Sequence, residues 1–227
     1  MIEVNKIYND DCLNILKQLP DKCIDLVLTD PPYTFNVGGF ANKRKSYEEM
    51  KKWTNSNINW YNDTFLKELC RISKNCNIVL FCQTGNLFNI LNFVNYNNLK
   101  YSLLPILKNN PAPLTNRTWM ANEYAISIYD KAIILNKDYY LKIPYFFVGN
   151  EKQTDHPNEK NINVIKRIIE NITKPNDLIL DCFSGSGTTA VACHNLNRKF
   201  ICIEKDYDYW KASCERLEEH QSQLRLF

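Results

Sequence analysis

Short apolar runs alternate with amphipathic stretches along the chain, and this alternation constrains the fold more than any other feature of the sequence. Strands that alternate with helices are typical of an α/β fold built on a largely parallel sheet. The runs predict strands over 4–8, 24–29, 77–82, 100–108, 123–129, 178–181 and 199–204. The intervening stretches predict helices over 12–19, 58–74, 85–97, 160–172, 188–195 and 206–220, and irregular structure over 34–57, 109–122 and 131–157.

A chain of 227 residues, of which 44% are hydrophobic, can bury the core of one domain, so a disordered chain is excluded. The net charge of +3 is only mildly basic, so any contact with nucleic acid must come from local basic patches. No apolar run reaches the roughly 18 residues that a membrane span needs, and the first residues lack a signal-peptide pattern. We therefore expect a cytoplasmic protein with no membrane contact.

Nine cysteines and three histidines are present, but they form no CxxC pair and no cluster with the spacing of zinc ligands. The number of cysteines is odd, and the sequence shows no secretion signal. These observations favour reduced, mostly buried thiols and no bound metal over disulfides or a zinc site.

Glycine is scarce, with six residues in the chain, so the place where two of them cluster is informative. The segment from Asp181 to Thr189 carries Gly185 and Gly187 between a predicted strand and a predicted helix. Glycines in such a turn let a ligand approach the backbone, and the helix N-terminus offers unpaired N–H groups. The segment lacks the lysine of a phosphate-binding loop and the third glycine of the dinucleotide motif. It indicates a nucleotide-like cofactor, with a plain strand–helix turn as the alternative.

Glu204 lies 19 residues after Gly185, at the end of the next predicted strand. A carboxylate in that place can accept hydrogen bonds from ribose hydroxyls. Because no basic residue is placed for phosphates, the turn and Glu204 suit a cofactor that has a ribose and no phosphate. S-adenosylmethionine is such a cofactor.

A second motif, Asp30-Pro31-Pro32-Tyr33, directly follows the predicted strand 24–29. The two prolines stiffen the backbone and remove two donors, so the Asp30 carboxylate and nearby carbonyls form an acceptor-rich site. Such acceptors suit an exocyclic amino group, because they build electron density on its nitrogen as a methyl group arrives. Tyr33 can stack on a base taken out of the duplex. A rigid turn after a strand is the alternative interpretation.

Together these motifs resemble the amino-methyltransferases of DNA, the adenine-N6 and cytosine-N4 group. In the N-terminal part, Tyr8 through Cys12 and Asp30 through Tyr33 are similar to the family's opening block. In the C-terminal part, His156 through Lys160, Phe183 through Thr189, and Glu204 are similar to its cofactor block. The catalytic motif precedes the cofactor motif, as in the β arrangement of that family. This order counts against the relatives that methylate protein glutamine or ribosomal RNA.

The resemblance implies a Rossmann-like S-adenosylmethionine-dependent methyltransferase sheet. The chain looks circularly permuted, opening just before the third strand of that sheet, which brings the strands that end at Asp181 and Asp30 side by side. We expect one methyltransferase domain over 1–227. Within it we expect a catalytic block at 1–33, a DNA loop at 34–57, a reduced target-recognition segment at 131–157 and a cofactor block at 156–220.

By the same resemblance, Glu204 holds the ribose of the cofactor, and Asp11 and Cys12 lie near its adenine. Lys160 reaches the cofactor carboxylate, although Asn161 replaces the proline that usually follows this lysine. Asp181 either caps the turn or contacts the cofactor. The expected catalytic residues are Asp30, Pro31, Pro32 and Tyr33. The expected cofactor-binding residues are Asp11, Cys12, Asp30, Lys160, Asp181, Phe183, Ser184, Gly185, Ser186, Gly187, Thr188 and Glu204, of which Phe183, Ser184, Gly185 and Gly187 wrap the methionine part.

DNA binding requires cations, and Lys43, Arg44 and Lys45 follow the catalytic motif closely. These three residues form either a DNA contact or a solvated charged loop. Arg117 and Trp119 lie in a second predicted loop, which either faces DNA or packs against a helix. The recognition segment of the β arrangement is reduced here to 136–155. The DNA sequence is therefore read through a short site, through the 34–57 loop, or with a homodimer or partner subunit.

These observations predict a site-specific adenine-N6 methyltransferase of double-stranded DNA, of the kind found in restriction–modification systems. Aspartate in the first position of the tetrad resembles the adenine-N6 type, whereas serine there resembles the cytosine-N4 type. The alternatives are a cytosine-N4 or RNA methyltransferase and a non-catalytic, cofactor-binding subunit of a modification complex. The intact tetrad argues against a non-catalytic subunit.

Overall fold

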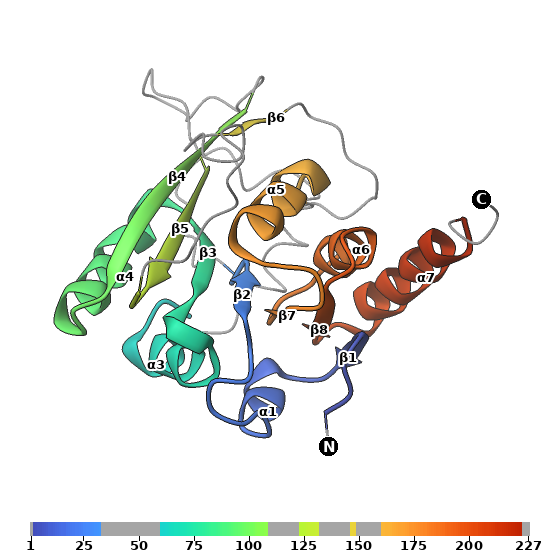
Figure 1. The fold of residues 1–227 in the computed structure, drawn as a ribbon, viewed down its shortest axis with the longest axis horizontal. Coiled ribbons are helices and arrows are strands. Elements are labelled where there is room, and N and C mark those ends of the chain that lie inside the picture. Colours follow the sequence, from blue (N-terminus) through green and yellow to red (C-terminus); the bar gives the residue numbers. More distant parts are fainter. Residues whose placement is uncertain (1, 33–59, 109–122, 132–145, 149–159, 224–227) are drawn as a thin grey trace, which may run out of the picture.

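The computed structural model describes residues 2–32, 60–108, 123–131, 146–148 and 160–223 (Figure 1). Within these ranges the strands form one mixed sheet of eight strands, in the order β1-β8-β7-β2-β3-β5-β4-β6. The α/β fold with a largely parallel sheet is therefore confirmed. The strands are β1 Lys6–Asn9, β2 Leu26–Thr29, β3 Ile78–Cys82, β4 Lys100–Lys108, β5 Glu123–Tyr129, β6 Phe146–Val148, β7 Leu178–Asp181 and β8 Lys199–Glu204.

The directions of the strands decide which residues meet at the edge of the sheet. β1, β8, β7, β2 and β3 run parallel to one another, so their carboxyl ends lie along one edge, here called the carboxyl edge. β5 is antiparallel to β3, and Tyr124 pairs with Cys82. The start of β5, at Glu123, therefore lies at the same edge as the end of β3.

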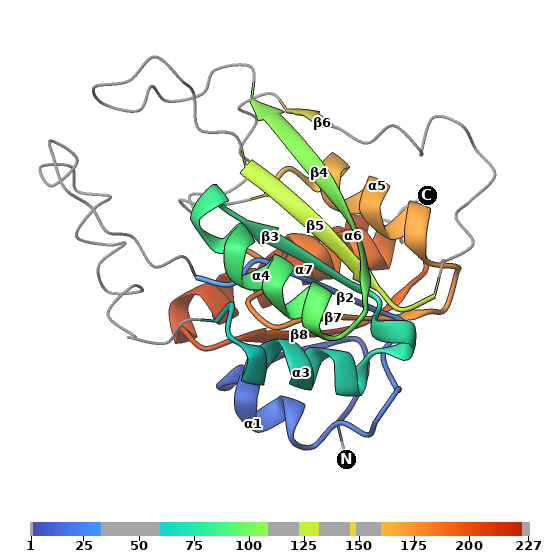
Figure 2. The same ribbon diagram turned by 90° about the vertical axis from the view of Figure 1, so that its left-hand side faces the viewer.

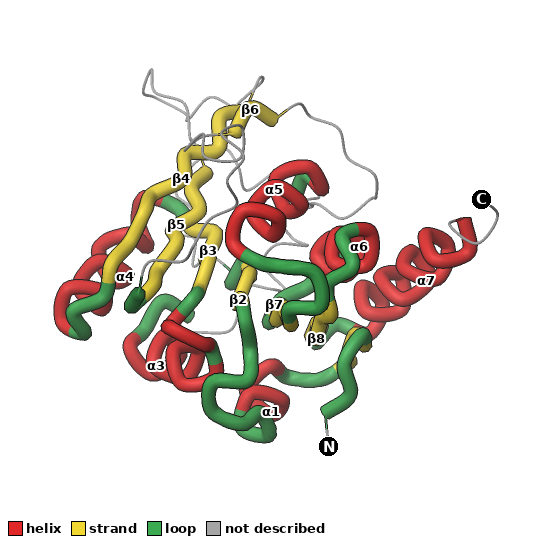
Figure 3. Tube along the Cα trace, in the orientation of Figure 1, coloured by secondary structure: helices red, strands yellow, loops and turns green. Residues whose placement is uncertain are grey.

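Helices cover both faces of the sheet, as Figures 1 and 3 show. On one face, Val27 of β2 packs in a core with α1, α3 and α4. On the other face, Leu28 packs in a second core with α5, α6 and α7. Neighbouring residues of β2 serve opposite cores because side chains alternate along a strand. The helices are α1 Cys12–Leu16, α3 Asp63–Ile72, α4 Thr84–Tyr96, α5 Ile162–Ile172, α6 Thr188–Asn195 and α7 Tyr207–Gln223.

Figure 2 views the sheet from the side that carries α4. All residues of β2 and β3 are buried, which is typical of parallel strands covered on both faces. Among the described helices, none combines the length and the hydropathy that a membrane crossing requires.

The helix α5 shows how the sequence positions the segment before it. Isoleucines recur at helical spacing, and α5 buries Ile165, Ile168 and Ile169 on one face. The Asn161 side chain accepts the backbone N–H of Asn163 at 2.9 Å and caps the helix. Asn161, which stands where the family usually has proline, therefore fixes the point at which the chain leaves Lys160 and enters α5.

The expectation of irregular structure over 131–157 is wrong at Phe146–Val148, which form β6 and pair in parallel with β4. A strand of three residues is too short for a period of two to be recognised in the sequence. The remainder of that segment from 132 onward, together with 34–57 and 109–122, lies outside the described residues. The circular permutation and the reduced recognition segment stay predictions.

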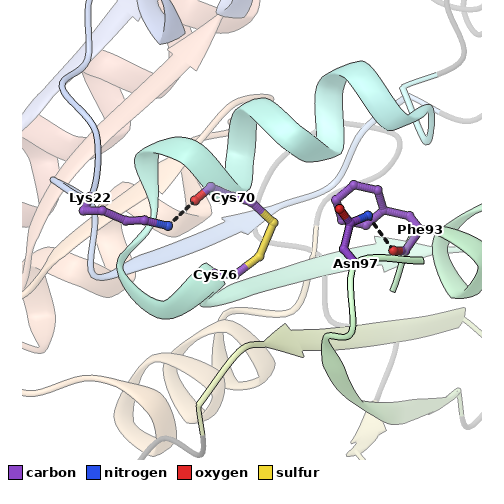
Figure 4. Close-up of a disulfide and its surroundings, with 5 residues drawn as sticks. All are labelled: Lys22, Cys70, Cys76, Phe93 and Asn97. Carbon is purple, nitrogen blue, oxygen red and sulfur yellow. Dashed lines mark hydrogen bonds between the residues drawn. A yellow bond between two sulfur atoms is a disulfide. The ribbon is translucent and has the colours of Figure 1, made fainter. Parts of the chain in front are cut away.

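The expectation of reduced thiols is wrong for one pair, because Cys70 and Cys76 form a disulfide (Figure 4). Cys70 lies on α3, and Cys76 ends the short 3-10 helix η2 (Lys74–Cys76) that follows it. The reversal of the chain after α3 brings the two residues together, and their spacing alone carries no such signal. The other cysteines of the described residues are free, and most of them are buried.

Candidate active site

The two sequence motifs meet at the carboxyl edge. Asp30 follows β2 and Asp181 ends β7, and these two strands are hydrogen-bonded neighbours. Glu204 ends β8, which is the next strand in the sheet, and Asp11 follows β1 beyond it. The order of the sheet thus gathers the predicted catalytic and cofactor residues from both ends of the sequence.

The Thr29 hydroxyl joins the end of β2 to the turn that follows β7. Thr29 Oγ1 donates to Asp181 Oδ1 at 2.9 Å and accepts the backbone N–H of Cys182 at 3.1 Å. The side chain is buried, so water cannot replace either bond. Thr29, directly before Asp30, therefore fixes the predicted catalytic motif relative to the glycine turn.

The Asp181 carboxylate accepts hydrogen bonds from three residues of the chain. Besides Thr29, its carboxylate accepts the Phe183 backbone N–H at 3.1 Å and the Thr189 hydroxyl at 2.6 Å. Burial raises the pKa of Asp181 to about 6, against these hydrogen bonds, which favour the ionised form. These hydrogen bonds organise the turn and the first turn of α6, which favours the capping role over a direct cofactor contact.

The glycine turn is held from outside by α7. Gly185 and Gly187 have φ angles of 49° and 76°, in the left-handed region that favours glycine. A Cβ on Gly187 would stand 2.9 Å from Ser213 Cβ, so only glycine lets α7 approach this closely. Arg216 of α7 donates through Nη1 to the Ser186 carbonyl at 3.0 Å. These contacts with α7 support the backbone of the turn.

Glu204 supports the same turn from the end of β8. Its Oε2 accepts the Gly185 N–H at 2.8 Å, and its Oε1 accepts the Asp206 N–H at 2.9 Å. Burial raises the pKa of Glu204, although the two N–H groups favour its charged form. Each carboxylate oxygen has a further lone pair, so Glu204 retains capacity to accept a ligand hydroxyl.

Two buried polar atoms beside the turn have no hydrogen-bond partner in the described structure: the Ser184 hydroxyl and the Trp60 indole N–H. Buried polar groups are usually paired, so unpaired ones beside a glycine turn fit a ligand that carries polar groups. Phe183 packs edge-on against Trp60 with ring centroids 4.8 Å apart and adds an apolar wall. The hydroxyls of Ser186 and Thr188 lie 3.1 Å apart and pair with each other.

Asp11 and Cys12 lie where β1 passes into α1. Asp11 caps this helix by accepting the Leu13 N–H at 3.0 Å, and it pairs with Lys205 at 2.9 Å. Burial works to raise the pKa of Asp11, but Lys205 and the Leu13 N–H outweigh burial and lower it overall. Burial raises the pKa of Cys12 to about 12, so its thiol is neutral and serves packing.

Asp30, Pro31 and Pro32 belong to the described residues, whereas Tyr33 lies outside them. The Tyr61 hydroxyl lies within hydrogen-bond distance of the Phe81 carbonyl, at 2.9 Å, and of the Pro31 carbonyl, at 3.3 Å. Burial raises the pKa of Tyr61, so the phenol keeps its proton and remains a donor. Tyr61 thereby anchors the first proline of the motif to β3.

Lys160 lies between two carboxylates of the chain. Its Nζ is 2.9 Å from Asp30 Oδ2 and 3.3 Å from Glu123 Oε2. Burial works to lower the pKa of Lys160, but the two carboxylates outweigh burial and raise it overall. The lysine that the resemblance associates with the cofactor is thus an immediate neighbour of Asp30, the predicted catalytic aspartate.

The proposed DNA-contacting residues lie outside the described part of the chain: Lys43, Arg44, Lys45, Arg117 and Trp119. Some residues of the site join it through contacts between distant segments and were not predicted from the sequence: Thr29, Trp60, Tyr61, Glu123 and Arg216. Only the predicted adjacency of the strands could have signalled them. Within the ranges that the structure describes, no cluster of metal-ligating side chains occurs.

The chain is similar to known methyltransferases in sequence. A family model described as DNA methylase matches residues 142–215. The type II methyltransferase M2.MboI of Moraxella bovis is 26% identical over 94% of this chain and 87% of its own length. The type II methyltransferase M.BglII of Bacillus subtilis is 27% identical over 91% of this chain and 67% of its own length.

Solved structures agree with this similarity. The M1.HpyAVI–SAM complex has a TM-score of 0.70 and 28% identity, covering 93% of this chain and 99% of that one. The PvuII DNA methyltransferase, described as cytosine-N4-specific, shares the fold with a TM-score of 0.72 at 17% identity, covering 96% of this chain and 91% of that one. With the two motifs meeting at the carboxyl edge of such a sheet, the chain is similar to the N6/N4 DNA methylase family in sequence and in fold.

Proposed function

We propose that this chain is an S-adenosylmethionine-dependent adenine-N6 methyltransferase of double-stranded DNA, with residues 1–227 forming one catalytic domain. The observation that carries the proposal is the Thr29 hydroxyl, which ties the catalytic motif to the turn after Asp181. The acceptor at Asp30 and the glycine turn therefore lie side by side at the carboxyl edge, where open α/β sheets bind their ligands. The M1.HpyAVI structure, solved as an S-adenosylmethionine complex, supports the choice of cofactor.

The residues at the turn fit this cofactor. The unpaired Ser184 hydroxyl offers a polar contact, and Phe183 with Trp60 offers an apolar wall. Glu204 retains acceptor capacity for ribose hydroxyls, and Asn9, which precedes Asp11 by two residues, is its neighbour in the paired strand. We assign cofactor binding to Asp11, Cys12, Asp30, Lys160, Asp181, Phe183, Ser184, Gly185, Ser186, Gly187, Thr188 and Glu204, with Asp181 acting through the turn.

S-adenosylmethionine supplies an electrophilic methyl group on a positively charged sulfur. The exocyclic amine of a base is a weak nucleophile, because its lone pair is delocalised into the ring. The Asp30 carboxylate accepts one of its N–H bonds and so raises the electron density on nitrogen. The nitrogen lone pair forms the bond to the methyl carbon, and the electron pair of the broken carbon–sulfur bond stays with sulfur. Asp30 stabilises the positive charge that nitrogen gains, and one proton then leaves to solvent.

The remaining members of the tetrad position the base. Pro31 and Pro32 carry no N–H, so no backbone donor competes for the acceptors at this point. The hydroxyl of Tyr61, a residue that precedes α3, lies within hydrogen-bond distance of the Pro31 carbonyl and of the Phe81 carbonyl of β3, and so holds the first proline in place. Tyr33 is assigned to stack on the extruded base, and Lys43, Arg44 and Lys45 to contact phosphates.

Adenine is favoured as the target because aspartate opens the tetrad. The test incubates the purified chain with methyl-labelled S-adenosylmethionine and duplex DNA of mixed sequence, followed by nucleoside analysis of the product. We expect labelled N6-methyladenine, and no label with Asp30→Asn as the control. N4-methylcytosine alone would overturn the assignment of the base. No label in any duplex would overturn the activity and favour a non-catalytic subunit.

A further inference from the structure

Trp60 belongs to neither sequence motif of the proposed site, yet it is connected to both. It directly precedes Tyr61, whose hydroxyl lies within hydrogen-bond distance of the Pro31 carbonyl. Its own ring packs edge-on against Phe183, in the segment that carries the glycine turn, with ring centroids 4.8 Å apart. Trp60 therefore lies near the junction of the tetrad and the turn, where a methyl donor must meet its acceptor.

The start of α3 holds Trp60 in this place. The Asn62 side chain caps α3 by accepting the Phe65 backbone N–H at 2.9 Å. The Phe65 ring then packs edge-on against Trp60, with ring centroids 5.1 Å apart. Trp60 is only 7% exposed, so its indole is packed between α3 and the glycine turn.

The Trp60 indole N–H is buried and has no hydrogen-bond partner within the part of the chain that the structure describes. The Ser184 hydroxyl, in the residue after Phe183, is buried and unpaired in the same way. Only its side chain lacks a partner, because the Ser184 backbone N–H donates to the Ile203 carbonyl at 2.9 Å. Buried polar groups without partners are costly and few. Two of them linked through one phenylalanine ring point to a ligand group that pairs with both.

The chemistry of the two groups defines what that ligand group must be. An indole N–H can only donate a hydrogen bond, so its partner is an acceptor, and a hydroxyl can donate to the same acceptor. The strongest acceptor of S-adenosylmethionine is the carboxylate of its methionine part, because hydrogen bonds to a charged group are the stronger ones. A carboxylate accepts several donors, so Trp60 and Ser184 can bind it together with Lys160.

We infer that Trp60 is a cofactor-binding residue, whose indole N–H donates, beside the Ser184 hydroxyl, to the carboxylate of S-adenosylmethionine. This inference rests on the proposed function. Both donor atoms are closed to water, so the carboxylate reaches them by displacing side chains that now cover them. A hydrogen bond to a charged group is strong in such a dry place. Trp60 thereby makes the site select nucleosides that carry an amino-acid carboxylate.

The test measures two dissociation constants by calorimetry, one for S-adenosylmethionine and one for its decarboxylated form, which keeps the sulfonium and the amine. Trp60→Phe removes the N–H and keeps an aromatic ring. We expect the dissociation constant for S-adenosylmethionine to rise by about tenfold, and that for the decarboxylated ligand to stay within about threefold of wild type. At saturating S-adenosylmethionine, kcat should stay near wild type, because the carboxylate takes no part in the reaction.

The matched control is Trp210→Phe on α7. The Trp210 indole N–H donates to the Ile7 carbonyl at 2.9 Å, so its partner belongs to the chain itself. The control removes the same atoms, and both dissociation constants should stay within about threefold of wild type. Its cost should appear instead as a lower melting temperature of the cofactor-free chain.

Ser184→Ala is a second variant, which removes the other donor with a small change in volume. It should reduce the preference for S-adenosylmethionine over the decarboxylated ligand, as Trp60→Phe does. This variant keeps the inference testable if Trp60→Phe lowers the melting temperature too far for binding to be measured. An unchanged preference in Ser184→Ala would contradict a shared acceptor.

The outcomes are distinguishable. Equal weakening of both ligands by Trp60→Phe would show that Trp60 is only an apolar wall and would overturn the inference. Equal affinity of the wild-type chain for the two ligands would also overturn it, because no donor would then recognise the carboxylate. A chain that shows the expected pattern of binding but methylates no DNA would overturn the proposed activity alone. A chain that does not bind S-adenosylmethionine would overturn both.

Discussion

The glycine turn and the charged cluster formed by Asp30, Lys160 and Glu123 lie at the same edge of the sheet, but they are built in different ways. In the turn, Asp181 and Glu204 accept N–H groups from residues close by in the sequence or in the same turn. In the cluster, Asp30, Lys160 and Glu123 come from three distant segments. The turn combines two local left-handed glycines with support from Glu204 and α7, whereas the cluster is created by tertiary contacts alone. Substitutions in the turn should change cofactor binding, and substitutions in the cluster should change turnover.

The largest effect is expected from Asp30→Asn, which removes one of the two carboxylates that contact Lys160. The amide keeps the size of the side chain but cannot match the carboxylate as an acceptor for the base amine. We expect methyl transfer to fall by about 10³-fold or more. Cofactor binding should weaken by no more than about threefold, because most of the residues assigned to the cofactor lie at the turn and keep their contacts. Filter binding of labelled DNA measures methyl transfer, and calorimetry measures the affinity for the cofactor. Lost cofactor binding would show that the two regions are not separable.

The second-largest effect is expected in the pH dependence of stability, through Asp181, which directly precedes the turn. Burial raises the pKa of Asp181 from its ordinary value of 3.8 to about 6. An acid whose pKa is raised by folding holds its proton more tightly in the folded chain. Its contribution to stability is therefore present below about pH 4 and is lost as the pH rises through about 6. The free energy of unfolding of wild type, relative to Asp181→Asn, should fall by about 3 kcal/mol across this window. Urea denaturation at each pH measures it, and a pH-independent difference would contradict the assignment.

Glu204→Gln tests whether the residues that hold the turn determine the affinity for S-adenosylmethionine. The variant removes the charge that holds two N–H groups and is assigned to the ribose. We expect the dissociation constant for S-adenosylmethionine to rise by about tenfold, as for one charge-assisted hydrogen bond, with kcat at saturation nearly unchanged. Glu219→Gln on the exposed side of α7 is the matched control. A fall in kcat with unchanged affinity would place Glu204 among the residues that affect turnover.

The smallest effect is expected from Thr29→Val, which cuts the connection between the two regions. Valine has nearly the same shape, but it leaves the Cys182 N–H without its buried partner and removes one of the two donors to Asp181 Oδ1. We expect the free energy of unfolding to fall by about 1–2 kcal/mol, with modest losses in both affinity and kcat. Thr29→Ser, which keeps the hydroxyl, should restore all three quantities. Thermal denaturation and steady-state kinetics measure them, and a loss confined to one quantity would show that Thr29 serves one region only.

The contrast between the two regions also explains what the sequence could predict. The unit from β7 through α6 to β8 matches its predicted bounds, 178–181, 188–195 and 199–204, because glycine, proline and apolar runs mark each boundary locally. The carboxyl edge followed from the parallel order of these strands. The family resemblance pointed to Asp30 and Lys160, but their contact through the fold was not predicted.

The features that could not be predicted from the sequence share one physical cause. Glu123 and Arg216 join the site through strand pairing and helix packing, which depend on residues far away in the sequence. The Cys70–Cys76 disulfide depends on how the chain reverses after α3, and β6 is too short to show a period. Each of these features is decided by tertiary contacts and leaves no local pattern.

The pairing of β1 with β8 has a consequence for how the chain is made. Lys6 lies opposite Ile201, and Thr29 bonds to Asp181 across 152 residues of sequence. At synthesis rates of roughly 5–20 residues per second, the strands of the N-terminal part wait on the order of ten seconds for their partners. During that interval the exposed edges of β1 and β2 are open to wrong pairing. A ribosome that pauses before residue 178 would lengthen this vulnerable period, so yield of folded enzyme should depend on translation speed through the middle of the message.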